Sequence, residues 1–319
     1  MYGVKVNVLT LYTVHMDNEV KFSVVIPTRN RDISLKNLLN KILNQTISPY
    51  EVIIVDSSDI KQSSLENIHK TIRYIHTPKK STAKQRNIGM LKVKEDAQAL
   101  FFLDDDTNPS SAYFKDMLET LFSLNAIGVS GLAINPRKSE RLKPSGPLGF
   151  LKKISFLDSN KDGKLLISGI GIPVRKIKTG IIEAEWLIGC ACWDFQKIKK
   201  LKFEEDFMGY SLGEDVIFSV NASKLGKLFV NSNIILDHME LPQTDPNIVK
   251  HNYMWVYYRF RLSKILNRKI LFYLGFYLSI LSKLIYSFFT MPLKPLLSVK
   301  QIVGLVLGLI NIFRDIFKR

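Results

Sequence analysis

Short apolar runs alternate with amphipathic stretches along the first half of the chain. Each run is rich in β-branched or aromatic residues and ends in a turn or in acidic residues, which is typical of buried strands. Between the runs, apolar residues recur at helical spacing, as Leu35, Leu38, Leu39 and Ile42 do after Asp32. This pattern predicts strands over residues 22–26, 51–56, 72–76, 99–106 and 126–134, and helices that begin near residue 32 and cover 63–70, 83–95 and 111–123.

Strands that alternate with helices at this spacing favour an α/β fold with a mostly parallel sheet and helices on both faces. The carboxyl ends of such strands meet at one edge, where α/β sheets bind their ligands. The polar features that end there are the loop from Pro27 to Arg31, Asp56, and the carboxylates Asp104, Asp105 and Asp106. Adjacent carboxylates repel one another, and a hard divalent cation would relieve that repulsion. A solvated acidic turn is the alternative, because Asp-Thr-Asn-Pro is a favourable turn sequence.

The pattern is less regular in the second half of the chain. Residues 135–164 are rich in glycine, proline, serine and lysine and predict a long loop or lid. Strand-like runs follow at 165–172, 183–195 and 228–236, with a loop predicted over 204–213. A helix then opens on Glu214 and Asp215, whose charges favour a helix N-terminus, so capping alone would explain them. Cys190 and Cys192 are expected on one face of a strand, in the core rather than on a metal.

Two long apolar segments lie near the end of the chain. Residues 270–289 contain one charged residue, Lys283, and residues 296–313 contain Lys300, with two prolines between the segments. Each segment has about the length that spans a bilayer core, which predicts a helical hairpin that either crosses a membrane or lies in its interface. A buried core hairpin is disfavoured, because the segments follow a complete α/β pattern and have basic flanks. Those flanks are Arg259, Arg261, Arg268 and Lys269 on one side and Arg314, Lys318 and Arg319 on the other, and they predict that both ends are cytoplasmic.

The 319-residue chain has a formal net charge of +16, and its cations are concentrated near the end. From His251 onward there are eleven lysine and arginine residues against one acidic residue, Asp315. Cations beside apolar segments favour an anionic lipid surface over nucleic acid, and no RNA- or DNA-binding motif accompanies them. Two cysteines and an N-terminal stretch without a long apolar core favour a cytoplasmic location for the α/β part.

Seven motifs in order give the sequence a family resemblance. They read FSVVIPTRNR, EVIIVDSSD, AKQRNIG, FLDDDT, WLIGCACWDF, GEDVIFS and ILDH. The chain resembles family 2 glycosyltransferases of the GT-A fold over roughly residues 22–240. The resemblance implies a glycosyltransferase domain over residues 1–250, with its core at 22–240. The apolar segments and their basic flanks predict a basic aromatic segment with a membrane-associated helical hairpin over residues 251–319.

The resemblance implies transfer of a sugar from a nucleotide-activated donor to an acceptor hydroxyl, with inversion at the anomeric carbon. Asp215 matches the general base of the family. The residues that match donor-binding positions are Pro27, Thr28, Arg31, Asp56, Arg86, Asn87, Asp104 and Asp105. Those that match metal-binding positions are Asp104, Asp106 and His238, the histidine being equally open to a structural role. Trp186 and Glu214 match acceptor-binding positions, with core packing as the alternative for the tryptophan.

The chemistry independently calls for these residue types. The nucleoside diphosphate that leaves is anionic, and Mn²⁺ or Mg²⁺ held by carboxylates would stabilise it. The acceptor hydroxyl has a pKa far above seven, so it requires a positioned carboxylate base.

We therefore expect a metal-dependent enzyme that uses a nucleotide sugar, with UDP-sugars favoured. Its expected acceptor is a lipid-linked saccharide at the cytoplasmic face of the membrane, in surface polysaccharide or glycolipid synthesis. The first alternative is a non-catalytic, membrane-bound protein that binds nucleotide sugars or polyanions, which would show donor binding without turnover. The second is a nucleic-acid binder, which charge alone would allow, but here the cations flank apolar segments.

Overall fold

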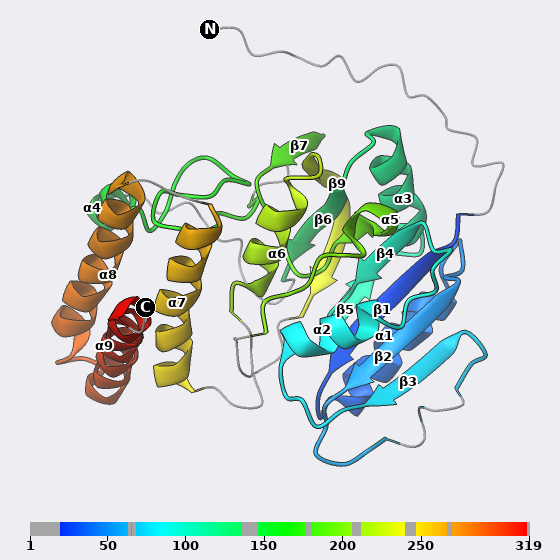
Figure 1. Ribbon diagram of the computed structural model, residues 1–319, viewed down its shortest axis with the longest axis horizontal. Helices are drawn as coiled ribbons and strands as arrows, with labels where there is room; N and C mark the ends of the chain where they lie inside the picture. The colour runs from blue at the N-terminus through cyan, green and yellow to red at the C-terminus, as the bar shows by residue number, and fades with distance from the viewer. Residues whose placement is uncertain are drawn as a thin grey trace, which may run out of the picture.

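A single mixed sheet, covered by helices, forms the larger part of the computed structural model, and three C-terminal helices lie to one side of it (Figure 1). The structure describes residues 20–62, 65, 68–135, 146–175, 180–205, 212–239, 247–266 and 270–317. The strands are β1 (Phe22–Thr28), β2 (Glu51–Asp56), β3 (Ile72–His76), β4 (Ala99–Phe102), β5 (Thr107–Pro109), β6 (Gly128–Ile134), β7 (Ile181–Ala184), β8 (Cys192–Asp194) and β9 (Leu228–His238). The helices are α1 (Asp32–Leu43), α2 (Thr82–Met90), α3 (Tyr113–Ser123), α4 (Gly146–Ile154), α5 (Phe195–Ile198), α6 (Glu214–Ala222), α7 (Ile248–Ile265), α8 (Ile270–Thr290) and α9 (Pro295–Phe317).

The strand order is β3-β2-β1-β4-β8-β6-β9-β5, with β7 beside β9. The first four strands in this order are parallel, as the alternation of strands and helices predicts. Beyond them the sheet is mixed, because β8 runs antiparallel to both β4 and β6 while β6 and β9 are parallel. The parallel half therefore brings the ends of β1, β2 and β4 to one edge.

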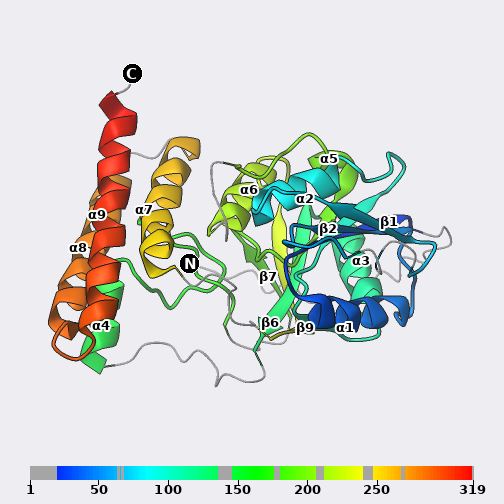
Figure 2. The ribbon, with the colours of Figure 1, turned by 90° about the horizontal axis from the view of Figure 1, so that it is seen from below.

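Helices cover both faces of the sheet (Figure 2). On one face α1 and α3 bury their apolar sides, and the four apolar residues expected in α1 are its buried residues. On the other face α2, α5 and α6 pack against the opposite sides of the same strands. Cys190 and Cys192 are buried together in the first of these cores, as expected. Both faces of the strands are therefore packed against helices.

Several predicted elements differ from the observed ones. β1 continues through Pro27 to Thr28, because by then it pairs with β2 alone and a residue without an N–H is tolerated. No helix reaches Ile68 to Lys70 at the end of the stretch predicted as 63–70, part of which lies outside the described residues. The helix predicted over 83–95 ends at Met90. The predicted loop over 135–164 contains the helix α4, and residues 165–172 form an isolated bridge rather than a strand.

Helix α7 joins the sheet domain to the C-terminal hairpin. One side of α7 packs with α6 in a cluster that includes Val216, Met254 and Tyr258. Its other side packs with α8 and α9 in a second cluster that includes Val256 and Phe276. The basic aromatic segment predicted before the hairpin is therefore largely an internal helix, because both of its sides are covered by other helices.

The two apolar segments form the helices α8 and α9, as predicted. Two stretches, Ile270–Thr290 and Pro295–Asp315, are long and apolar enough to cross a membrane by length and composition. Most of each stretch is not buried inside the protein, which leaves a broad apolar surface on the hairpin.

Two of the cations expected to flank the hairpin are placed differently from the prediction. Arg259 is fully buried, and Arg261 pairs with Glu204 of the sheet domain at 3.0 Å. Both belong to α7, whose packing turns them inward. Arg268, Lys269, Lys318 and Arg319 lie outside the described residues.

Candidate active site

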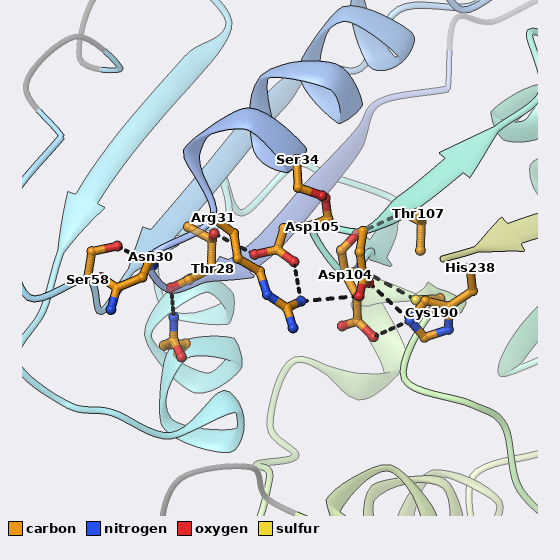
Figure 3. Close-up of polar contacts among 12 residues, drawn as sticks. Thr28, Asn30, Arg31, Ser34, Ser58, Asp104, Asp105, Thr107, Cys190 and His238 are labelled. Carbon is orange, nitrogen blue, oxygen red and sulfur yellow. Dashed lines mark hydrogen bonds and ion pairs between the residues drawn. The ribbon is translucent and has the colours of Figure 1, made fainter. Parts of the chain in front are cut away.

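Three strand ends bring most of the predicted site residues together. Thr28 at the end of β1 lies opposite Asp56 at the end of β2, and the turn that follows β4 carries the three aspartates. Arg31 follows β1 and reaches across to this turn (Figure 3). This edge of the sheet therefore carries several carboxylates, and the guanidinium of Arg31 contacts them.

Asp105 fastens the turn after β4 to the loop after β1. Its carboxylate accepts hydrogen bonds from Thr28 Oγ1 at 2.6 Å and from Arg31 Nη1 at 2.9 Å. Its backbone carbonyl accepts a third from Ser34 Oγ at 2.7 Å (Figure 3). Burial raises the pKa of Asp105 to about 6, although the bonds from Thr28 and Arg31 oppose that rise. The contacts of Asp105 are those of a structural residue, and they do not support the predicted contact with a donor.

Asp104, Asp106 and His238 form a cluster at the end of the sheet. The antiparallel pairing of β5 with β9 sets His238 opposite Thr107, the residue directly after Asp106. His238 Nε2 lies 3.1 Å from Asp106 Oδ1 and 3.8 Å from Asp104 Oδ2. The short strand β5 therefore brings His238, which lies far along the chain, next to the aspartates.

The chemistry of this donor set fits a divalent metal. One ligand atom from each of the three residues lies within 4.8 Å of the others. Neighbouring ligands of an ion coordinated at about 2.1 Å lie about 3 Å apart at right angles, which is close to the separation of His238 from Asp106. Carboxylates suit Mg²⁺ and Mn²⁺, and an imidazole is a ligand for transition metals.

Arg86 links this cluster to the start of α6. The guanidinium is 2% exposed, donates to Asp104 Oδ1 at 2.8 Å and forms a short ion pair with Glu214 Oε1. It lies over the rings of Phe102 and Phe203, at 5.7 and 5.5 Å from their centroids. Burial by itself would lower the pKa of Arg86, but the carboxylates of Glu214 and Asp104 raise it. Arg86 is therefore permanently charged and holds two carboxylates from distant parts of the chain together.

Asp215 follows Glu214 in the first turn of α6. Its Oδ1 accepts the backbone N–H of Val216 at 2.8 Å. Burial raises the pKa of Asp215, while the positive charge of Arg86 and the Val216 N–H oppose the rise. An ionised carboxylate with a raised pKa is a stronger proton acceptor than a solvated one.

The remaining predicted residues have structural contacts. Asp56 accepts from Ser58 N–H at 2.8 Å and from the Tyr74 hydroxyl at 2.7 Å, and Pro27 is buried in β1. Asn87 bonds both backbone groups of Phe203, and so it holds the loop that precedes α6. Trp186 lies in the core, where its indole N–H donates to the Ile172 carbonyl at 3.3 Å. Its acceptor role stays a prediction that this buried position does not support.

Sequence reasoning missed three residues that build the site. Gln85 donates to the carbonyls of Thr28 and Val55 at 2.8 and 2.7 Å, which ties the ends of β1 and β2 together. At Gly189, a Cβ would lie 2.6 Å from Arg86 Nη2, so the glycine admits the guanidinium. Cys190 Sγ accepts the Asp104 N–H at 3.4 Å. The available signal was the glutamine within AKQRNIG, since a side-chain amide that becomes buried must find hydrogen-bond partners.

Replacing Arg86 with methionine is expected to lower the free energy of unfolding by about 3–5 kcal/mol, because it leaves Asp104 and Glu214 without their shared cation. Urea unfolding followed by circular dichroism measures the change. Lys36→Met removes an exposed ion pair with Asp32 and should cost less than about 1 kcal/mol. Equal effects of the two substitutions would show that Arg86 has no special structural role.

Gly213 sets the start of α6 through its backbone conformation. Its φ is +83°, and a Cβ there would lie 2.4 Å from Tyr258 Cδ2 of α7. Gly213→Ala is expected to cost about 2–4 kcal/mol, from left-handed strain together with the steric clash. Gly146→Ala is the control, since φ is +68° but nothing lies within 4 Å. Thermal unfolding of both variants should separate strain from clash, and equal shifts would exclude the contact with Tyr258.

Comparison with known families bears on this site. Residues 23–171 match the family model described as Glycosyl transferase family 2. The match begins in β1 and includes the turn with the three aspartates. It confirms the predicted resemblance over those residues and supports the prediction of a glycosyltransferase. A comparison with curated proteins found no match.

Several solved structures share the fold of this chain. The crystal structure of S. aureus TarS has a TM-score of 0.53 at 16% identity, with 85% of this chain and 43% of TarS covered. A structure of GalNAc-T7 with UDP, GalNAc and Mn²⁺ has a TM-score of 0.54 at 16% identity, with 76% of this chain and 51% of that chain covered. S. aureus TarS 1-349 with UDP has a TM-score of 0.50 at 15% identity, with 90% and 89% covered.

These likenesses confirm the GT-A fold that the sequence motifs predict. The chain spans about half the length, or less, of the first two of these proteins.

Proposed function

We propose that this chain, whose residues 23–171 match a glycosyltransferase family model, is a metal-dependent inverting glycosyltransferase. It would use a nucleotide sugar, with UDP-sugars favoured, and transfer the sugar to a hydroxyl of a lipid-linked saccharide at the cytoplasmic membrane face. Two fold neighbours were solved with UDP, one of them with Mn²⁺, which supports testing uridine donors and manganese first. Such a reaction belongs to surface polysaccharide or glycolipid synthesis.

One observation carries the proposal. Arg86 pairs with Asp104 of the metal-ligand cluster and with Glu214, the neighbour of Asp215. A donor site and a base must lie on opposite sides of the reacting carbon, at a fixed separation. The buried guanidinium of Arg86 would keep the metal-ligand side and the base side at such a fixed separation.

On the donor side, Asp104, Asp106 and His238 would hold a divalent metal. When bound, the metal would stabilise the negative charge of the departing diphosphate. Thr28 and Arg31 line the loop proposed to lie beside the nucleoside, and Asp56 is proposed to bind the base. The contacts of Asp105 support a different role, since it positions Arg31 and the turn that carries the metal ligands.

On the acceptor side, Asp215 is proposed to remove the proton from the attacking hydroxyl. Its raised pKa makes the carboxylate a stronger base, and it must be ionised to act, so transfer should slow as the pH falls through that pKa. Glu214 is engaged by Arg86 and so orients the first turn of α6 rather than competing for the proton.

The hairpin is proposed to lie in the membrane interface rather than to cross the bilayer. Helix α9 packs closely on α7, because a Cβ at Gly304 would lie 2.3 Å from the Val249 carbonyl oxygen. Helix α7 carries polar and charged side chains such as Arg261, which pairs with the sheet domain. A hairpin that crossed the bilayer would pull this polar helix into hydrocarbon, which is costly. The expected boundary at residue 250 remains our proposal, with α7 as the connecting helix.

A panel of nucleotide sugars tests the proposal. We expect one uridine donor to raise the melting temperature of the full chain in Mn²⁺ by several degrees, since ligand at 100 times its Kd adds about 2.7 kcal/mol. Chelation with EDTA should remove most of the shift, because the diphosphate then loses its cation. The same donor should release nucleoside diphosphate when a membrane lipid extract is supplied. Absence of stabilisation by every donor would refute the proposed donor site.

A further inference from the structure

Buried arginines in this protein differ in how their charge is neutralised. The side chain of Arg175 is 8% exposed and pairs with Asp158 at 2.7 Å and Asp162 at 3.0 Å. Arg86 has Asp104 and Glu214. Arg259, in contrast, is fully buried, and no carboxylate among the described residues pairs with it. A buried charge without a counter-ion is destabilising, so an anion from outside the chain is the expected partner.

The contacts of Arg259 leave part of its guanidinium available. Its Nε donates to the Trp255 carbonyl at 2.9 Å, and its Nη1 donates to Ser279 Oγ at 2.6 Å and to the Ser168 carbonyl at 3.2 Å. The guanidinium carbon lies 3.5 Å from the centroid of the Trp255 ring. Nη2 is buried and has no hydrogen-bond partner among the described residues. All the described acceptors are neutral, and one donor group remains unused.

A second cation contacts the same indole ring. Lys283 of α8 sits over the Trp255 ring, with Nζ 4.0 Å from its centroid. Lys283 also forms no salt bridge with any carboxylate in the described part of the chain. Trp255 and Lys283 are half-buried, so Lys283 and the indole can be reached from the surface between α7 and α8, whereas Arg259 is fully buried beside them. Two like charges beside one indole attract an anion that can accept from both.

We propose that Arg259 and Lys283 bind the phosphate group of a membrane lipid in the junction between α7 and α8. The outward faces of α8 and α9 are apolar, which would bring the junction to the headgroup layer, where lipid phosphates are concentrated. Arginine and lysine together suit a phosphate oxygen cluster, the arginine by its fork of donors and the lysine as a point charge. Free phosphate has the same chemistry but would have no need of the apolar surroundings.

The position of this junction suggests what the lipid would do. Tyr258, the neighbour of Arg259, contacts Gly213 at the start of the helix that carries Asp215. A phosphate held at Arg259 would therefore be one helix away from the proposed base. Use of this site by a lipid-linked acceptor rests on the proposed function, whereas binding of a lipid phosphate does not.

Binding of the full chain to vesicles tests the site. The vesicles are phosphatidylcholine alone or phosphatidylcholine with 5–10% phosphatidic acid, in about 0.15 M salt to limit long-range attraction. We expect wild type to prefer phosphatidic acid and Lys283→Met to lose at least about tenfold in affinity for it. Lys300→Met, which removes an exposed lysine of α9, measures the general loss of charge, about a few-fold. Equal losses in the two variants would overturn the proposal.

Two further measurements test the role of Arg259 and distinguish a lipid phosphate from free phosphate. Arg259→Lys keeps the charge but removes the fork of donors, and it should weaken phosphatidic acid binding while the circular dichroism spectrum stays unchanged. If this variant unfolds, Lys283→Met still decides the matter. Inorganic phosphate at 10 mM should neither compete with the vesicles nor alter tryptophan fluorescence, and full competition would assign the site to free phosphate instead. Thermal stabilisation by a nucleotide sugar in Mn²⁺ without lipid, measured in parallel, reports the proposed donor site separately.

Discussion

Asp215→Asn is expected to lower the rate of sugar transfer by about 10²–10⁴-fold, the usual contribution of a positioned general base. Asparagine has the same shape and can still accept the Val216 N–H, but it cannot take a proton from the acceptor hydroxyl. Donor affinity should change little, because the metal-ligand residues follow β4 or belong to β9 and none of them is in α6. Single-turnover transfer with saturating donor separates the two effects.

The matched control for this experiment is Asp116→Asn, on the surface helix α3. It makes the same chemical change far from the proposed base and should leave the rate within about twofold. Full activity of Asp215→Asn would remove Asp215 as the base. A loss of donor binding in that variant would instead indicate that α6 had shifted.

Asp106→Asn is expected to raise the Mn²⁺ concentration needed for half-maximal turnover by at least about tenfold. Asp106 is one of the three residues whose ligand atoms lie together, and even outer partners of a metal ligand affect affinity by about 10–100-fold. A titration of Mn²⁺ at fixed donor concentration measures the shift, and EDTA should abolish turnover of the wild-type protein.

The neighbouring residue provides a sharp control. Asp105→Asn alters the bonds to Thr28 and Arg31, so it should lower stability rather than selectively weaken the metal. Equal dependence on Mn²⁺ in wild type and Asp106→Asn would contradict the proposed metal site. A loss of stability in Asp105→Asn and a loss of metal affinity in Asp106→Asn would support separate roles for the two aspartates.

The strand ends were predictable because their signal is local. Each parallel strand is a short apolar run that stops at a polar residue, and parallel strands must end at one edge. The sequence alone therefore places Thr28, Asp56 and the aspartates after β4 at one edge of the sheet. Helix α1 was equally clear, since its apolar spacing predicts its buried face.

The long-range links could not be predicted in the same way. The ion pair of Arg86 with Glu214 joins residues 128 positions apart, and nothing in local periodicity encodes it. The division of roles among the aspartates also depends on contacts with the end of β1 and the loop after it, where Thr28 binds Asp105 and Arg31 binds both Asp105 and Asp106. Arg259 is predicted to flank the apolar segments because the sequence shows its charge but not the helix packing that buries it.

Release of nucleoside diphosphate from a nucleotide sugar by the wild-type full chain tests the proposed transferase activity. Release is measured with a detergent-solubilised membrane lipid extract as acceptor, in Mn²⁺ and in EDTA. We predict release in Mn²⁺, none in EDTA, and a new glycosylated lipid in amounts that match the nucleotide. Binding of a donor without any release in Mn²⁺ would contradict the enzyme assignment and would instead support a protein that only binds nucleotide sugars.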